Sequence, residues 1–111
     1  PAPLASAWGA IPYMVLLILA ILLIELAAYW RHRLEHHPAL WRFHATHHAD
    51  EELHWLSVLR KHPVSKFMEM LADTLPALLL GLPAWSVVAA QLVRSWWGYF
   101  IHADVPWTLG P

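Results

Sequence analysis

The stretch IPYMVLLILAILLIELAA, from Ile11 to Ala28, decides the fold of this chain. It contains a single charged side chain, Glu25. A helix that crosses a bilayer needs about 20 mostly apolar residues, and about 17 is the lower limit. Tyr29 and Trp30 follow directly, and such aromatic side chains gather at the membrane–water interface. We therefore predict a transmembrane helix over residues 11–30.

Basic residues lie on only one side of this stretch. Arg31, Arg33 and Arg42 follow it, so the positive-inside rule places its C-terminal end in the cytoplasm. A secretory signal peptide is the competing interpretation, but such a peptide has basic residues ahead of its apolar core. The segment PAPLASAWGAIP over residues 1–12 contains no Lys or Arg. The pattern favours a membrane anchor.

The composition of the whole chain also indicates a membrane protein. Hydrophobic residues make up 59% of the 111 residues and charged residues 14%, whereas soluble proteins average about 45–50% and about 25%. The formal net charge of −1 argues against a nucleic-acid partner, which would favour a basic excess. Because the chain has no Cys, disulfides and thiolate-bound clusters are excluded, and any metal must bind to nitrogen or oxygen ligands.

Residues 31–66 form a polar segment that we predict to be cytoplasmic and helical. Pro38 and Pro63 are expected helix boundaries, because the residue before a proline avoids the helical conformation. We expect one helix that ends at about residue 36, a second that runs from 39 to about 48, and a third that lies within 51–59.

Residues 67–103 form a second apolar segment, which Gly81-Leu82-Pro83 interrupts near its middle. Helices over 64–80 and 84–102 would be long enough to cross most of a bilayer and would form a membrane hairpin. Asp73 leaves open whether the hairpin crosses fully or only enters the bilayer. The predicted fold class is all-α integral membrane, in a single partial domain over residues 1–111: an N-terminal transmembrane helix, a cytoplasmic histidine-rich helical segment and this hairpin.

Eight of the nine histidines lie between His32 and His62. His32 and His36 are four residues apart, so their imidazoles share one helix face. His44, His47 and His48 form an H-x2-H-H motif, which can offer two rings to one ion and the third to a neighbouring ion. The hairpin would return His102 to the same side. We predict a two-metal site, whose metal stays open because imidazole suits Zn, Cu, Fe and Ni alike.

Other residues of these segments have less specific interpretations. His54 and His62 are expected to be interfacial or capping residues, and His37 to be solvent-facing or to support a ligand. Glu35 is expected to pair with Arg31. Glu25 is interpreted as a partner of a metal-bound His or as a snorkelling residue. Asp50 and Asp104 are interpreted as possible ligands or His orienters. Trp96–Phe100 is interpreted as an interface belt or as the wall of a substrate channel.

The segments YWRHRLEHHPALWRFHATHHADEE, LRKHPVSKF and GYFIHADVPW together resemble the membrane fatty acid hydroxylase and sterol desaturase superfamily. The resemblance covers roughly residues 25–111. It implies an integral-membrane oxygenase of the bacterial inner membrane or the endoplasmic reticulum, which hydroxylates or desaturates a fatty acyl, sterol or ether lipid. Its cofactors would be two non-haem irons, with O2 as co-substrate and electrons from an external electron-transfer protein or reductase.

The resemblance also assigns the metal ligands. His32 and His36 match the first histidine box, His44, His47 and His48 match the second, and His102 matches an isolated ligand-type histidine; no catalytic residue beyond these ligands is implied. The family's last H-x2-H-H box is expected beyond residue 111, and the chain begins at Pro1 without Met. We therefore expect a fragment with little or no activity by itself.

Two other classes of function compete with a lipid oxygenase. A non-catalytic membrane metal-binding or transport segment would place its ionisable groups near the middle of the spanning helices, whereas here they crowd toward one surface. A zinc-dependent hydrolase would carry an H-E-x-x-H motif, which is absent. A pH sensor needs no fixed histidine spacing, and a haem needs only two axial histidines.

Overall fold

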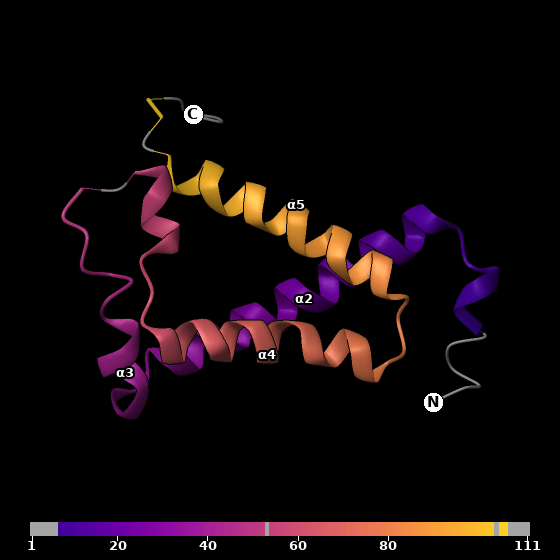
Figure 1. Cartoon of the computed structure of the whole chain (residues 1–111), viewed down its shortest axis with the longest axis horizontal. Helices are drawn as coiled ribbons and strands as arrows, with labels where there is room; N and C mark the ends of the chain where they lie inside the picture. The colour runs from indigo at the N-terminus through magenta and orange to yellow at the C-terminus, as the bar shows by residue number, and fades with distance from the viewer. Residues whose placement is uncertain (1–6, 53, 104, 107–111) are drawn as a thin grey trace.

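The computed structural model describes residues 7–52, 54–103 and 105–106, and every regular element among them is helical, which confirms the all-helical class. Three long helices run side by side along most of the molecule, and two shorter elements close one end (Figure 1). The elements in chain order are η1 (Trp8–Ala10), α2 (Tyr13–Glu35), α3 (Pro38–His44), η2 (Trp55–Leu59), α4 (Pro63–Leu79) and α5 (Ala84–His102).

Helix α2 is the described helix that is long and apolar enough to cross a membrane, judged by length and composition. One narrow stripe of it is buried at four-residue intervals, formed by Leu16, Ala20, Ile24 and Ala28. Large apolar side chains on its other faces are exposed, among them Tyr13 at 76% and Leu22 at 60%. Such a continuous exposed apolar surface is unusual on a protein surrounded by water.

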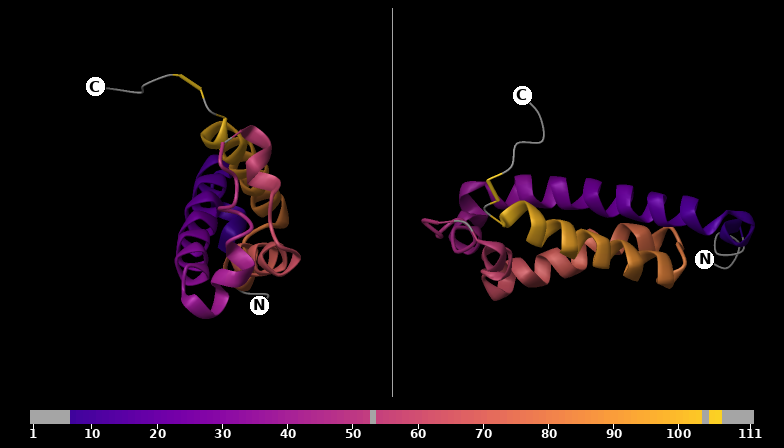
Figure 2. Two further views of the ribbon diagram at one scale, coloured as in Figure 1. Left: turned by 90° about the vertical axis from the view of Figure 1, so that its left-hand side faces the viewer. Right: turned by 90° about the horizontal axis from the view of Figure 1, so that it is seen from above.

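Helices α4 and α5 are joined by a short turn at Gly81, whose φ of 73° is a left-handed conformation that glycine adopts without strain. They run in opposite directions and diverge from the turn (Figure 1), and both pack mainly against α2 (Figure 2). Ala20 of α2, Ala77 of α4 and Ala90 of α5 are fully buried in this packing, because small side chains let helices approach closely.

The C-terminal ends of α2 and α5 and the N-terminal end of α4 lie at the same end of the molecule as α3 and η2 (Figure 1). The sequence predicts a helix from 39 to about 48 in this region, but the observed helix α3 ends earlier, at His44. The backbone N–H of His47 donates to His44 O at 2.8 Å and that of His48 to Ala45 O at 3.1 Å. These bonds span three residues instead of four, so the chain turns and brings His48 back over His44.

Candidate metal centre

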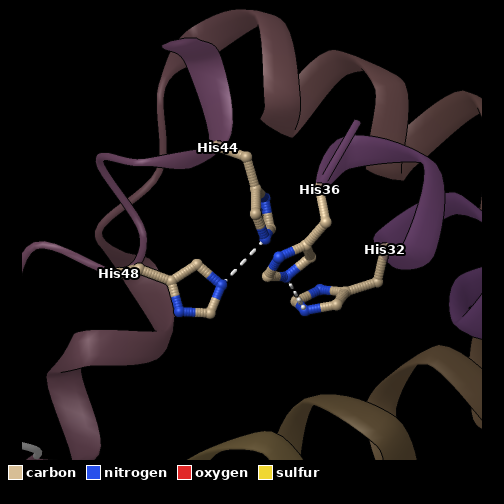
Figure 3. Close-up of side chains that lie close together, drawn as sticks. All are labelled: His32, His36, His44 and His48. Carbon is tan, nitrogen blue, oxygen red and sulfur yellow. Dashed lines mark hydrogen bonds between the residues drawn. The ribbon is translucent and has the colours of Figure 1, made fainter. Parts of the chain in front are cut away.

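Four of the six expected ligand histidines converge where α2 meets α3. The ring nitrogens that His32, His36, His44 and His48 offer all lie within 4.8 Å of one another (Figure 3). His32 Nε2 is 3.2 Å from His36 Nε2, and His44 Nε2 is 3.0 Å from His48 Nε2. The sharp turn at His37-Pro38, where α2 ends and α3 begins, brings the two motifs together.

The two Nε2–Nε2 separations, 3.2 and 3.0 Å, fit pairs of nitrogens that share a metal ion. Two nitrogens bound to one ion at about 2.1 Å, at angles of about 90° to 109°, lie about 3.0 to 3.4 Å apart. Two neutral imidazoles that point Nε2 at each other can form only one hydrogen bond per pair, whereas two lone pairs can both point at a cation. The donor set is all imidazole, which suits iron as well as zinc, copper and nickel.

The other two expected ligands, His47 and His102, lie side by side next to this cluster. Their ring centroids are 5.7 Å apart, and the ring of His47 is 5.6 Å from that of His44. Among the described residues His47 Nδ1 is buried without a hydrogen-bond partner. His102 Nδ1 lies 2.8 Å from the carbonyl oxygen of Gly98, which can only accept, so Nδ1 carries the proton and Nε2 is free to bind a ligand.

The protonation state of the second motif suits metal binding. Burial, with the imidazole of His32 adding to it, lowers the pKa of His44 to about 3. Burial likewise lowers the pKa of His47 and of His48. These imidazoles are therefore neutral at pH 7, which is the form that donates a lone pair to a metal.

The carboxylate of Glu35 contacts Nδ1 of the His44 ring. Glu35 Oε2 lies 3.1 Å from His44 Nδ1 and accepts a hydrogen bond from Arg31 Nη1 at 2.7 Å. Both Glu35 and His44 are nearly inaccessible to solvent, at 1% and 2% exposure. The expected pairing of Glu35 with Arg31 is confirmed, and the contact with His44 is one that the spacing did not predict.

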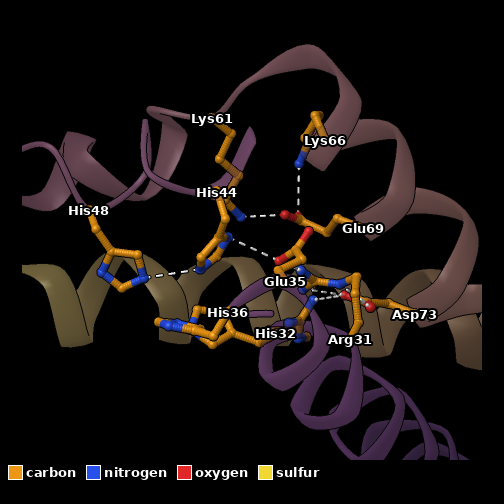
Figure 4. Close-up of polar contacts among 11 residues, drawn as sticks. Arg31, His32, Glu35, His36, His44, His48, Lys61, Lys66, Glu69 and Asp73 are labelled. Carbon is orange, nitrogen blue, oxygen red and sulfur yellow. Dashed lines mark hydrogen bonds and ion pairs between the residues drawn. The ribbon is translucent and has the colours of Figure 1, made fainter. Parts of the chain in front are cut away.

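Glu35 belongs to a chain of ion pairs that links three helices, and Figure 4 shows the part of it formed by Glu35, Arg31 and Asp73. Arg31 on α2 donates to Asp73 on α4 through Nε at 2.7 Å and Nη2 at 3.1 Å. Asp73 also accepts from Arg94 Nη1 on α5 at 2.8 Å, and Arg94 Nε is 3.0 Å from Glu25 Oε1. Asp73 is fully buried.

A cavity of about 270 Å³ adjoins the histidines between α2, α4, α5 and η2. Rings of His32, His44, His47 and His102 face it, together with charged side chains, and Trp97 and Tyr99 form part of its wall. Gly98 leaves no empty space, because a Cβ there would lie 3.3 Å from Val58 Cγ2. Trp97 and Tyr99 thus line a cavity, in keeping with the channel interpretation of Trp96–Phe100, but charged side chains line it as well as apolar ones.

The remaining histidines have capping roles. His54 caps η2 through a reciprocal contact with Ser57, and His62 Nδ1 accepts from the Val64 N–H at the start of α4, which confirms the expectation for both. Exposed His37 caps α3 by accepting from the Ala39 N–H.

Two further carboxylates, those of Glu25 and Asp50, pair with arginine side chains. Glu25, whose side chain is half-exposed, pairs with Arg94. Asp50 pairs with Arg60 instead of orienting a histidine. The expectation for Asp104 lies outside the described residues.

Sequence reasoning missed Arg31, Asp73 and Arg94 as parts of the site. Arg31 is 8% exposed and lies between Glu35 and Asp73. Arg60, which is exposed, pairs with Asp50, and Lys61 pairs with Glu69. The signal for Asp73 was available: a carboxylate within an apolar helix is costly unless it is paired.

Comparison with known proteins places this geometry in a family. The model of the fatty acid hydroxylase family matches residues 17–111, so the chain belongs to that family. The resemblance inferred from the histidine motifs is thereby confirmed.

A curated relative is the ornithine lipid hydroxylase OlsE of Rhizobium tropici, which is 31% identical over 101 residues. The match covers 90% of this chain and 30% of the relative's length. No solved structure matches the chain.

Proposed function

We propose that this chain forms the histidine-bearing part of a membrane-bound non-haem di-iron hydroxylase that acts on a lipid. Family membership supports a lipid-modifying oxidoreductase. The observation that carries the metal assignment is the convergence of four imidazoles from two motifs, with ligand atoms within 4.8 Å. Because the chain spans only 30% of the relative's length, the activity is proposed for the full-length protein.

The six histidines would divide into two sets. His32, His36, His44 and His48 would hold one iron, and His47 and His102 would contribute to a second iron beside it. When bound, the irons supply the oxidising power, together with O2 and electrons from an external electron-transfer protein or reductase, that attack on an unactivated C–H bond requires and that no side chain provides.

The chain's own residues prepare the site for this chemistry. Burial keeps His44 neutral, Glu35 orients its ring, and the Gly98 carbonyl orients His102 by accepting from Nδ1. The cavity of about 270 Å³ beside the rings offers room for the reacting part of a substrate. Fixing ligand rings through their second nitrogen is a general device for tuning metal sites.

The exposed apolar surfaces support a membrane arrangement. Helix α2 would cross the bilayer, α4 and α5 would form a hairpin within it, and the histidine end would face the cytoplasm, with the lipid entering laterally. Arg33 and Arg42 are exposed near that end and could attract anionic headgroups or an acidic electron donor. Family membership, rather than the position of the ionisable groups, favours an oxygenase over a transport role, since Glu25, Asp73 and Arg94 lie midway along their helices.

The relative suggests which substrate to test first. OlsE is named for hydroxylation of ornithine lipid, and this name favours hydroxylation over desaturation for the present chain. An ornithine-containing lipid is therefore the first candidate, ahead of fatty acyl, sterol and ether lipids.

One experiment addresses both metal and reaction. The full-length protein is purified anaerobically, its metal content is measured, and Mössbauer spectra are recorded. We expect two antiferromagnetically coupled irons per chain.

The reaction is tested by expressing the protein in a bacterium that makes ornithine lipid. The wild type should add 16 mass units to that lipid, and the His32→Ala variant should not. A redox-inert metal in place of iron, or an unmodified set of membrane lipids, would contradict the proposal.

A further inference from the structure

The chain of buried ion pairs ends on a histidine of the metal cluster. From the far end, Glu25 pairs with Arg94, Arg94 with Asp73 and Asp73 with Arg31. Arg31 then pairs with Glu35, whose Oε2 also contacts His44 Nδ1 (Figure 4). The chain thus connects α2, α4 and α5 to the ring of His44 on α3.

Glu35 is a second carboxylate that pairs with Arg31, in addition to Asp73. Arg31 and Asp73 alone would suffice to join α2 to α4. The additional carboxylate of Glu35 lies in the last turn of α2, where the helix dipole disfavours a negative charge, so helix packing does not account for it.

The contact with Glu35 determines which nitrogen of His44 carries the proton. Glu35 Oε2 lies 3.1 Å from His44 Nδ1, and because an ionised carboxylate can only accept hydrogen bonds, this proximity favours a proton on Nδ1. A neutral imidazole has one N–H, and Nε2 of His44 is therefore left with its lone pair. That Nε2 is the atom 3.0 Å from His48 Nε2, inside the four-histidine cluster.

The position of Glu35 is in turn fixed by Arg31. Arg31 donates a hydrogen bond from one nitrogen to Glu35 and from two nitrogens to Asp73. This forked pairing holds the guanidinium plane in one orientation. Arg94 holds Asp73 from the other side. Residues on three helices therefore set the direction in which His44 Nε2 points.

We propose that Glu35 is the positioning residue of the metal centre: it fixes the Nδ1–H tautomer of His44 and aims Nε2 at the ion, and Arg31 and Asp73 hold it in place. The proposal rests on the proposed function in taking His44 as a metal ligand. Ligand-supporting partners of this kind typically change metal affinity about 10- to 100-fold when they are removed.

The first test uses the metal-free protein and needs no iron. The full-length protein is labelled with 15N-histidine, His44 is assigned by comparison with the His44→Gln variant, and the ring nitrogen shifts are read by NMR in micelles. We expect the Nδ1–H tautomer for His44 in the wild type. In Glu35→Gln we expect a mixture, because the amide can donate to Nδ1 as well as accept from it. An Nε2–H tautomer in the wild type would overturn the proposal even if the variant does not fold.

The second test measures affinity with Co²⁺ as the probe, followed by its visible absorption. Glu35→Gln should weaken Co²⁺ binding about 10- to 100-fold. Glu25→Gln is the charge control, because it removes one negative charge from the half-exposed far end of the same chain, where the carboxylate contacts Arg94 rather than a histidine. We expect it to change affinity less than about threefold and to leave the tautomer unchanged.

The two proposals fail in distinguishable ways. Equal losses of affinity in Glu25→Gln and Glu35→Gln would show that net charge matters and positioning does not. An unchanged affinity in folded Glu35→Gln would also overturn the positioning role. If the wild type shows the Nδ1–H tautomer but binds no metal, the proposed function fails while the orientation of His44 by Glu35 stands.

Discussion

The two ends of the helix bundle bury opposite kinds of side chain. Toward the Gly81 turn, Ala20, Ala77 and Ala90 belong to a cluster of buried hydrophobic residues. Toward the histidine end, Arg31, Glu35 and Asp73 are as deeply buried, but each is held by ion pairs. The same three helices thus combine an apolar half that suits a lipid environment with a charged half that orients imidazoles.

This contrast indicates what each half contributes. Close packing of small residues is non-directional and tolerates exchanges of similar volume. Buried ion pairs add little net stability, but removing one partner is costly because the other charge stays buried. The apolar half therefore sets how the helices assemble, and the charged half sets where the metal ligands point.

The largest expected effect is on Asp73, the charge shared by both arginines. Asp73→Ala leaves Arg31 and Arg94 without their common partner, and we expect a loss of about 3–5 kcal/mol in the free energy of unfolding. Thermal unfolding in detergent measures it. At the apolar end, Leu82→Met is the comparison and should cost less than about 1.5 kcal/mol, because it conserves the buried volume. Equal costs at both ends would remove the contrast.

The next effect concerns the metal rather than the fold. His44→Ala removes a central ring of the cluster, and we expect Co²⁺ or Fe²⁺ affinity to fall more than about 100-fold, since loss of a ligand should exceed loss of its supporting partner. Equilibrium titration measures this. His54→Ala, which removes a cap of η2 outside the cluster, should retain affinity within about threefold. A similar loss in both variants would exclude a specific role for His44.

Acid should weaken the histidine end in the metal-free protein. The pKa of His44 is lowered from 6.5 to about 3 by burial, so between these values the unfolded chain binds a proton that the folded chain does not. The free energy of unfolding should be insensitive to this group above pH 6.5 and should fall as pH drops below it. Denaturant unfolding at pH 7 and pH 5.5 measures the slope. His44→Gln should flatten it, and an unchanged slope in that variant would contradict the assignment.

The smallest effect is expected at Gly98, where α5 passes η2. An added Cβ would lie 3.3 Å from Val58 Cγ2, so Val58 must shift by a few tenths of an ångström. Alanine favours a helix over glycine by about 1 kcal/mol, which opposes this strain. We expect Gly98→Ala to change unfolding free energy by less than about 1 kcal/mol, and Val58→Ala combined with it to remove the strain. A loss above about 2 kcal/mol would show that η2 is held rigidly.

Much of the architecture follows from local sequence signals. The apolar run before Arg31, the prolines at 38 and 63 and the Gly81 turn predict the long helices closely, and α5 has the expected bounds of residues 84–102. These signals suffice because helix boundaries depend on proline and glycine conformations and on burial of apolar runs. The expected second-motif helix is too long, because its C-terminal residues form tighter turns.

The candidate site is only partly readable from the sequence. Spacing at three or four residues predicts that His32 lies near His36 and His44 near His48, since a helix turn fixes these neighbours. The approach of the two pairs also follows from the tight connection at Pro38. The membrane setting, the two irons and the ligand roles stay predictions.

By itself, the sequence determined the helices, their breaks and the histidine motifs, because each depends on residues within a few positions of one another. Only the tertiary structure decided that Arg31 turns inward to Asp73, which is 42 residues away in sequence, and that Glu35 reaches His44. Those contacts depend on which faces of α2 and α4 meet. That choice is made by packing across the whole bundle, and no local pattern encodes it.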